Sequence, residues 1–279
     1  MNKSTLLREL ITSPEMLLMP DAYDPLSARL IESVGFKAVQ CSGYSFALAA
    51  RCSSEAALGL ERNLAITKAI VEAVDVPVMA DGEDGFGNPS AVAETVRAFI
   101  GAGVAGINLE DQVLGEPSPK RVVDRGLMVE KIRAARQAAQ QEGIPDLVIN
   151  GRTDALAVAS NRGEGLEEAI ARANLYLEAG ADLAFVTGVV AISEVRTLVD
   201  GIHGPVSIAA GLPNNINSLS LAELKACGVA RVSLPVIVIF SAIRAINRML
   251  VALRDCGDFS VILQEKMLCS PEEIAALKR

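Results

Sequence analysis

The sequence has very few aromatic side chains and almost no imidazole. Tryptophan is absent, aromatic residues make up 4% of the 279 residues, and His203 is the single histidine. The core must therefore be built from Ala, Val, Ile and Leu, which are plentiful because 51% of the residues are hydrophobic. We expect His203 in a surface turn ahead of a strand, which excludes a Ser-His-Asp or Cys-His nucleophile.

The sequence also shows no basic stripe, and we expect neither an export signal nor a membrane span. A net charge of −8 and a pI near 4.9 argue against nucleic acid as a partner. Arg8 and Glu9 interrupt the N-terminal segment, and the longest apolar stretch, 232–243, is short and contains a proline, so neither export nor membrane insertion is expected. The five cysteines have no metal-ligand spacing, which predicts reduced thiols and a cytoplasmic protein.

What is present is a repeat of short apolar runs. Four follow a glycine and four follow or contain a proline, and the two kinds alternate along the chain, at 13–19, 34–39, 75–80, 102–107, 144–150, 179–186, 204–209 and 227–234. Segments with helical periodicity separate them. Runs that are apolar throughout are typical of parallel strands covered on both faces. The pattern predicts an α/β protein, a (β/α)₈ TIM-type barrel.

Two further points concern the organisation of the chain. A doubly wound sheet is the alternative, but the first run is followed by MPDAYDPLSA, which has no glycine-rich fingerprint. We predict a catalytic barrel at 1–255 and a C-terminal helical tail at 256–279. The helical segment at 239–255 and this tail exceed what closing a barrel requires. We therefore expect the extra helices to pack on a neighbouring subunit of a homo-oligomer.

Acidic residues gather where two neighbouring strands are expected to end. The segment ADGEDGFG carries Asp81, Glu83 and Asp84, and the next strand ends at Glu110. Active sites of such barrels lie at these strand ends. Oxygen ligands without His or Cys suit a hard cation, Mg²⁺ or Mn²⁺. The alternative is that the acids only cap helices or solvate loops.

Other chemistries lack their residues at the strand ends. No strand end carries the lysine of a Schiff-base aldolase, and phosphate-binding glycines are scarce after the last two strands. Arg152 follows the fifth strand. A cation chelated by a 2-oxo acid, together with Arg152, would stabilise the enolate formed when a bond at C3 breaks. Alternatively, Arg152 only braces the barrel through Asp154 or Glu110.

The motifs resemble those of one known group of enzymes. The runs PDAYDPLSARLIESVGFKAVQCSGYSFA, ADGEDGFGNP, GINLEDQ and INGRTDA, in this order over about 18–255, resemble the isocitrate lyase/phosphoenolpyruvate mutase superfamily. The resemblance implies a Mg²⁺-dependent barrel enzyme, a homotetramer or homodimer that exchanges its last helix between subunits. It implies these roles: Asp81 as direct metal ligand, Glu83 and Glu110 as ligands through water, Ser42, Gly43 and Tyr44 as substrate-binding residues, and Arg152 beside the enolate oxygen.

The chain departs from the lyases of that superfamily at several positions. Their KKCGH loop corresponds to 113–131, which keeps Lys120 and Arg121 but has neither Cys nor His. The usual D-x-D metal motif has Glu83 as its second acid. Thr187 replaces a Glu on the sixth strand, and Ala209–Ala210 replace an Asn on the seventh. Because the cysteine that protonates the leaving product is missing, cleavage of 2-methylisocitrate or isocitrate by the usual route is not expected. The replacements on the sixth and seventh strands favour a smaller or less charged substrate.

Three functions remain open. The first is a carbon–carbon lyase for a small 2-oxo or 2-hydroxy carboxylic acid, similar to an oxaloacetate decarboxylase or hydrolase, with Tyr44 and Arg152 as catalytic residues. The second is a P–C bond enzyme, a phosphonomutase or phosphonopyruvate hydrolase. Members of the superfamily with this activity typically carry lysine and asparagine in a gating loop after the second strand. The corresponding loop at 50–63 has no lysine and only one asparagine, Asn63. The third is a barrel that binds a small acid without turning it over.

Overall fold

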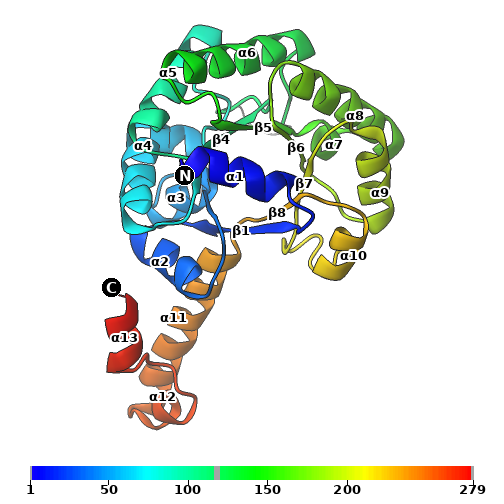
Figure 1. Ribbon diagram of the computed structural model, residues 1–279. Helices are drawn as coiled ribbons and strands as arrows, with labels where there is room; N and C mark the ends of the chain where they lie inside the picture. The colour runs from blue at the N-terminus through cyan, green and yellow to red at the C-terminus, as the bar shows by residue number, and fades with distance from the viewer. Residues whose placement is uncertain (1, 116–119, 278–279) are drawn as a thin grey trace.

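The computed structural model describes residues 2–115 and 120–277 and confirms the barrel. Its eight strands are all parallel and pair in chain order, with β8 closing on β1 (Figure 1). They are β1 (Leu17–Ala22), β2 (Val39–Cys41), β3 (Val78–Asp81), β4 (Gly106–Glu110), β5 (Val148–Thr153), β6 (Leu183–Val186), β7 (Val206–Ala209) and β8 (Arg231–Leu234).

The predicted runs locate every strand but begin too early. Each strand starts after the Gly or Pro that opens its run, because those residues form the turn from the preceding helix. Gly35, Gly103, Gly180 and Gly228 have φ of 98°, 86°, 113° and 83°, the left-handed conformation that ends a helix at little steric cost. Apolar residues in these turns therefore extend the pattern beyond the strands themselves.

Helices cover the outside of the barrel between successive strands. The helical patterns correspond to α2 (Pro25–Ser33), α5 (Pro89–Gly101), α6 (Arg125–Gln141), α8 (Arg162–Glu178), α9 (Ile192–Gly201) and α10 (Leu221–Ala226). Side chains that accept backbone N–H groups begin several of them, such as Asp24 for α2 and Asn88 for α5. Further helices are α3 (Gly43–Ala49), α4 (Glu55–Ala73) and the short α7 (Ala155–Val158).

The N-terminal helix closes one end of the barrel. In α1 (Lys3–Thr12), Leu7 and Ile11 are buried and pack in one cluster with inward-facing strand residues, among them Met19 and Met79. Figure 1 shows α1 lying across the barrel at this end. Substrate access must therefore be from the opposite end, where the strands terminate at their carboxyl ends.

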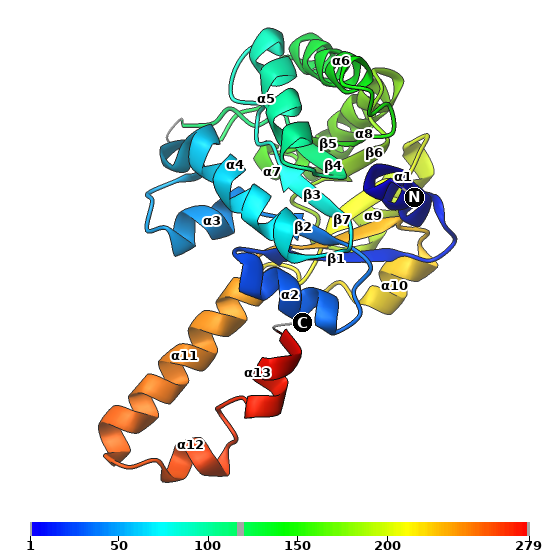
Figure 2. The ribbon, with the colours of Figure 1, turned by 60° about the vertical axis from the view of Figure 1, so that its left-hand side comes forward.

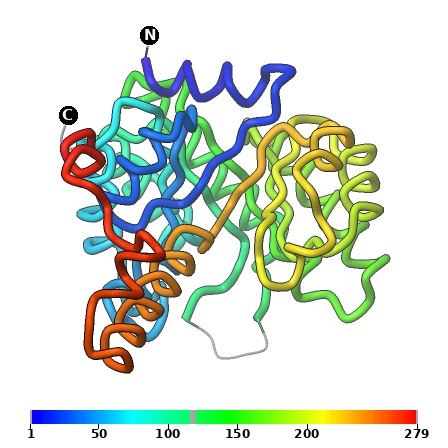
Figure 3. Tube along the Cα trace, turned by 90° about the horizontal axis from the view of Figure 1, so that it is seen from below, coloured from blue at the N-terminus to red at the C-terminus, as the bar shows by residue number. Residues whose placement is uncertain are grey.

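The C-terminal helices extend away from the barrel. α11 (Ile237–Cys256) leaves it, and α12 (Ser260–Gln264) and α13 (Pro271–Leu277) turn back so that α13 contacts α2 (Figure 2). Figure 3 shows this segment beside the blue and cyan first half of the barrel. Among the residues described, none of the helices is long and apolar enough to cross a membrane.

Candidate active site

A cavity of about 400 Å³ opens at the carboxyl ends of the strands. Residues from β2 through β8 line it, as do Tyr44 of α3 and Phe240 of α11. Six of the residues predicted from the sequence line this one cavity: Ser42, Tyr44, Asp81, Glu83, Glu110 and Arg152. His203 is exposed in the turn before β7, outside the cavity, as predicted.

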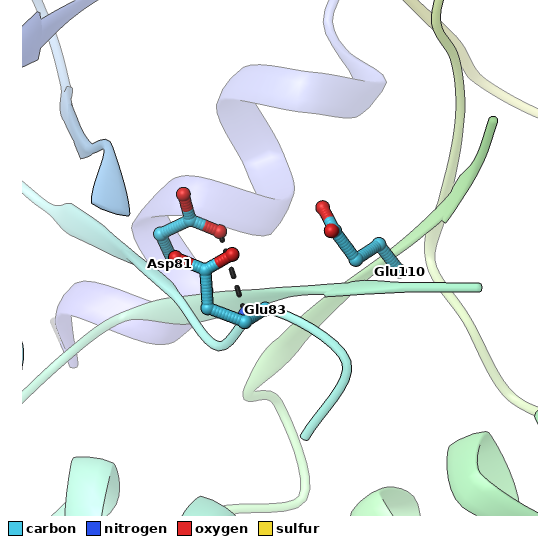
Figure 4. Close-up of side chains that lie close together, drawn as sticks. All are labelled: Asp81, Glu83 and Glu110. Atoms are coloured by element: carbon cyan, nitrogen blue, oxygen red, sulfur yellow. Dashed lines mark hydrogen bonds between the residues drawn. The ribbon is translucent and has the colours of Figure 1, made fainter. Parts of the chain in front are cut away.

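Three carboxyl groups converge in this cavity. Asp81 ends β3, Glu83 follows two residues later and Glu110 ends β4, so that adjacent parallel strands deliver them to one place. One carboxylate oxygen from each lies within 4.8 Å of the other two (Figure 4). Asp84, the fourth acid of the segment, is not part of the group and instead lies 3.8 Å from Lys131.

The position of Glu83 requires unusual local backbone. Its φ of 51° lies in the left-handed region, which non-glycine residues adopt only where surrounding contacts compensate for the strain. A Cβ added at Gly43 would lie 1.7 Å from the Glu83 Oε1 atom, so a side chain at this position would displace the Glu83 carboxyl group from where it now lies. The chain thus places an acid in a strained conformation against a bare backbone.

The electrostatics of the acids favour a bound cation. Burial, followed by the nearby Asp81, Glu110 and Glu55 carboxylates, raises the pKa of Glu83 well above its usual value. Burial likewise raises the pKa of Glu110, against the opposing effect of Arg152. Glu83 Oε1 is buried and has no hydrogen-bond partner. These all-oxygen donors fit a hard divalent cation. A bound cation would offset the burial of the carboxylates and their mutual repulsion.

Arg152 faces the acidic group from β5. Its Nη1 lies 2.5 Å from Glu110 Oε2 and its Nε lies 2.8 Å from Asp154 Oδ2, so both bracing contacts considered from the sequence are present. The side chain is nevertheless 20% exposed and lines the cavity. Although burial opposes ionisation, these carboxylates raise the pKa of Arg152 well above its usual value. Arg152 is therefore a fixed cation within reach of a bound anion.

The Ser42–Tyr44 segment begins α3 beside the acids. The Gly43 N–H donates to Asp81 Oδ2 at 2.8 Å, and Ser42 Oγ accepts the Ser45 N–H at 3.4 Å. Ser45 in turn donates to the buried Asp21 at 2.5 Å, which ties the segment to β1. The Tyr44 ring is half exposed and its edge packs against Phe240 at 6.4 Å between centroids. The substrate-binding roles of these residues stay predictions.

A buried network holds the ends of β4 and β5 together. Asp111 is fully buried; its Oδ1 accepts the Asp154 N–H at 2.9 Å, and its Oδ2 accepts from the Tyr176 hydroxyl at 2.7 Å and Arg172 Nη1 at 3.1 Å. Burial raises the pKa of Asp111, and these donors partly counteract that effect. Asp111 thus helps to hold the end of β4, with Glu110, beside the end of β5, with Arg152.

Arg172→Met is expected to lower the free energy of unfolding by about 3–5 kcal/mol, because it leaves Asp111 buried without its cation. Urea denaturation of both proteins measures the difference. Arg97→Met is the matched control, since Arg97 of α5 pairs with Glu142 on the surface with 41% of its side chain exposed, and its loss is expected to cost less than about 1 kcal/mol. Equal losses in the two variants would contradict the role of the network.

Cys41 ends β2 and lines the cavity, but its thiol has no chemical role in our interpretation. The side chain is buried, and burial raises its pKa to about 12, so the thiol stays protonated at neutral pH. Cys41→Ser is therefore expected to keep kcat/KM within about threefold of the parent in a steady-state assay. A loss of about 100-fold or more, the size typical of a missing acid or base, would refute this.

Several residues of the cavity escape an inspection of strand ends. Gln40, Asn108, Phe185 and Arg231 lie inside strands, one or more residues before the carboxyl end, and still reach the cavity. The available signal was a polar or charged residue within a short strand, as Arg231 is in the run RVSL. Deciding that such a residue points inward requires the strand boundaries, which the sequence pattern placed too early.

Comparison with known proteins decides the family. A model of the phosphoenolpyruvate phosphomutase family matches residues 7–254. The chain belongs to this family. Its relatives include 2,3-dimethylmalate lyase from Eubacterium barkeri, which is 34% identical over 260 residues, 91% of this chain and 87% of that protein. The resemblance drawn from the motifs is confirmed.

Solved structures of other enzymes share the whole barrel. Oxaloacetate acetylhydrolase in complex with the inhibitor 3,3-difluorooxalacetate is similar at a TM-score of 0.87 and 28% identity, covering 99% of this chain and 94% of that one. Phosphonopyruvate hydrolase in complex with oxalate and Mg²⁺ gives 0.87 and 27%, covering 100% and 95%. Both carbon–carbon and P–C bond chemistry therefore occur among proteins with this fold.

Proposed function

We propose that the protein is a Mg²⁺-dependent carbon–carbon lyase, for which Mn²⁺ is also suitable, acting on a small 2-oxo or 2-hydroxy carboxylic acid. The observation that carries the proposal is the convergence of Asp81, Glu83 and Glu110 in one cavity opposite Arg152. Similarity to 2,3-dimethylmalate lyase and oxaloacetate acetylhydrolase supports the same reaction class. The reaction would resemble that of an oxaloacetate decarboxylase or hydrolase.

Asp81, Glu83 and Glu110 would hold the divalent cation. When bound there, the cation supplies Lewis acidity toward the carboxylate and carbonyl oxygens of a 2-oxo acid. The fit rests on the unpartnered Glu83 Oε1 and on the all-oxygen donor set. Asp81 has a second task, because its Oδ2 accepts the Gly43 N–H and so orients the Ser42–Tyr44 segment.

Arg152 would stabilise the negative charge that develops on the pyruvate enolate when the bond at C3 breaks. Its guanidinium is held by Glu110 and Asp154 before substrate arrives, so little reorganisation accompanies the reaction. Ser42 and the Gly43 backbone would bind the substrate carboxylate from α3. Tyr44, at the exposed edge of the cavity, would donate a hydrogen bond to the substrate and shield it from water.

The position of Asn63 disfavours P–C bond chemistry. The segment 50–63, expected from the sequence to be a loop, instead belongs mostly to α4, and Asn63 is its one asparagine. Asn63 is 1% exposed, donating to the Asp81 carbonyl oxygen at 3.0 Å and accepting from Thr67 at 3.2 Å. Asn63 therefore supports β3 from behind and does not face the cavity. Residues 50–63 include no other amide side chain and no lysine that could contact a phosphonate.

A substrate screen tests the proposed function. Purified protein with Mg²⁺ is incubated with oxaloacetate, 3-alkyl oxaloacetates, 2-alkylmalates and phosphonopyruvate, and products are identified by NMR. Cleavage of a carbon–carbon bond faster than Mg²⁺ alone achieves supports the lyase. Turnover confined to phosphonopyruvate would favour the P–C enzyme, and binding of oxalate without turnover of any substrate would favour a non-catalytic binding barrel.

We further propose that the protein works in the cytoplasm as a homodimer or homotetramer, with α11 to α13 packed on a neighbouring subunit. One stretch of α11 exposes Ile243, Ile246, Leu250 and Val251, and Phe259 and Leu263 beyond it are also exposed. Apolar residues grouped in this way mark an interaction surface. Light scattering is expected to give two or four times the chain mass of 29.3 kDa, and a monomer would refute the proposal.

A further inference from the structure

The interior of the barrel beneath the acids is polar. Inward-facing positions of such barrels are usually filled by branched apolar residues. Here Arg231 of β8 is 2% exposed and lines the cavity, surrounded by Gln40 of β2, Phe185 of β6, Ser207 of β7 and Ser233 of β8. We call these five residues the Arg231 cluster.

Neutral groups satisfy part of the Arg231 guanidinium. Its Nη1 donates to Ser207 Oγ at 3.0 Å, its Nη2 donates to Gln40 Oε1, and its Nε contacts the Met19 sulfur at 3.1 Å. A guanidinium has five N–H groups, so these contacts leave one on each terminal nitrogen available. Gln40 is itself held by a bond from its Nε2 to Ser233 Oγ at 2.9 Å.

No carboxylate neutralises this arginine at ion-pair distance within the described residues. Arg152 differs, since Glu110 and Asp154 both pair with it. Both guanidinium carbons lie near the Phe185 ring, at 5.9 Å from its centroid for Arg152 and 5.6 Å for Arg231. Burial lowers the pKa of Arg231 to about 9, opposed by attraction to Asp81. A buried charge of this kind is costly unless an anion accompanies it.

We propose that the Arg231 cluster is a second anion subsite, which binds a carboxylate at the far end of the substrate while the acids and Arg152 handle the reacting end. The proposal rests on the proposed function and narrows its substrates to dicarboxylic acids. The planar fork of arginine matches a carboxylate, and its two remaining N–H groups can donate to it. A dicarboxylic acid is smaller and less charged than the tricarboxylic isocitrate, so the subsite agrees with the substrate expected from the departures at Thr187 and Ala209–Ala210.

The alternative is that Arg231 only links β8 to β2 and β7 through neutral hydrogen bonds. The two interpretations differ in what they expect of ligands. A structural link would affect every ligand of the cavity alike or not at all, whereas a subsite affects only ligands that carry a second carboxylate. Malate and 2-hydroxybutyrate make this comparison, because they share a four-carbon 2-hydroxy acid and differ in a carboxylate replacing a methyl group.

Calorimetry with the full-length protein and Mg²⁺ measures the affinities for malate, 2-hydroxybutyrate and oxalate. The parent protein is expected to prefer malate by about 10- to 100-fold, the range for hydrogen bonds to a charged group. Arg231→Met is expected to reduce that preference to less than about threefold while oxalate binding is retained. A parent protein without the preference, or an Arg231→Met variant that keeps it, would overturn the subsite.

Gln40→Glu is the second variant, and it decides the question if Arg231→Met does not fold. It places a carboxylate on the atom position that already accepts from Arg231 Nη2, so the arginine gains its counter-ion and the cluster keeps its shape. The preference for malate should disappear in this variant, and its persistence would refute the proposal. Ser207→Ala, which removes one neutral partner and leaves the charge, is the control expected to retain most of the preference.

Failure of the proposed function would look different. Should the parent protein cleave no substrate while the malate preference still depends on Arg231, the lyase assignment fails and the subsite stands. Should cleavage occur with a preference that Arg231→Met leaves unchanged, only the subsite fails. Repeating the malate and 2-hydroxybutyrate titrations without Mg²⁺ separates the contribution of the cation from that of Arg231.

Discussion

Asp81→Ala is expected to abolish the Mg²⁺-dependent binding of oxalate and to lower turnover by on the order of 10²-fold or more. Two effects combine in this expected result. The variant removes the acid of the group that ends β3, and it leaves the Gly43 N–H without the acceptor that it has at 2.8 Å. Calorimetric titration of oxalate with Mg²⁺, and again with excess EDTA, measures the loss directly.

Two further variants separate these effects. Asp84→Asn is the matched control, because Asp84 belongs to the same acidic segment but lies beside Lys131 and outside the acidic group. It should bind oxalate like the parent protein. Asp81→Asn keeps the shape of the side chain and removes its charge, so it should lose Mg²⁺-dependent binding while retaining the thermal stability of the parent. Unchanged oxalate affinity in Asp81→Ala would refute the metal assignment.

The acidic group was predictable because its residues are local to strand ends. Once the alternation of runs predicts a barrel, Asp81 and Glu110 must lie at the same end of adjacent strands. The order of the strands along the chain is then enough to bring the two acids together. An error of two or three residues in a strand boundary does not separate Asp81 from Glu110. Arg152 follows from the same reasoning, since it pairs in register with Glu110 across β4 and β5.

The Arg231 cluster was not predictable in this way. Its members come from β2, β6, β7 and β8, and each faces inward only if the strand register is correct to a single residue, because successive side chains point to opposite faces. Ser207 and Arg231 lie opposite each other in the β7–β8 pairing. Every predicted run begins before its strand. The inward and outward positions therefore cannot be assigned by counting from the start of a run.

The backbone strain and the role of Asn63 also depend on tertiary structure. The segment ADGEDGFG does not predict that Glu83 adopts a positive φ or that it lies against Gly43, a residue 40 positions away. Asn63 is visible in the sequence only as the one asparagine of the segment 50–63, and packing of α4 against β3 directs its amide to the Asp81 carbonyl oxygen. Each is determined by which elements pack together.

Arg152→Ala is expected to lower kcat by at least about 10²-fold, the size typical of lost oxyanion stabilisation. The structure requires a careful choice of variant, because Arg152 also neutralises the buried Glu110 and Asp154. Removing it leaves both carboxylates without their cation, so part of the loss in Arg152→Ala could come from a changed acidic group. Arg152→Lys keeps the charge and removes the second donor of the fork.

Comparing Arg152→Ala with Arg152→Lys shows whether the loss of kcat comes from the transition state or from the bracing of β4 against β5. If Arg152 stabilises the transition state, Arg152→Lys should bind oxalate with Mg²⁺ about as well as the parent protein yet remain defective in kcat, with KM little changed. If Arg152 only braces β4 against β5, Arg152→Lys should restore kcat and stability together, since a lysine can still neutralise Glu110. Near-normal turnover in Arg152→Ala would remove this arginine from the mechanism altogether. A kcat defect that persists in Arg152→Lys, in a protein that still binds oxalate, would place its guanidinium at the reacting oxygen.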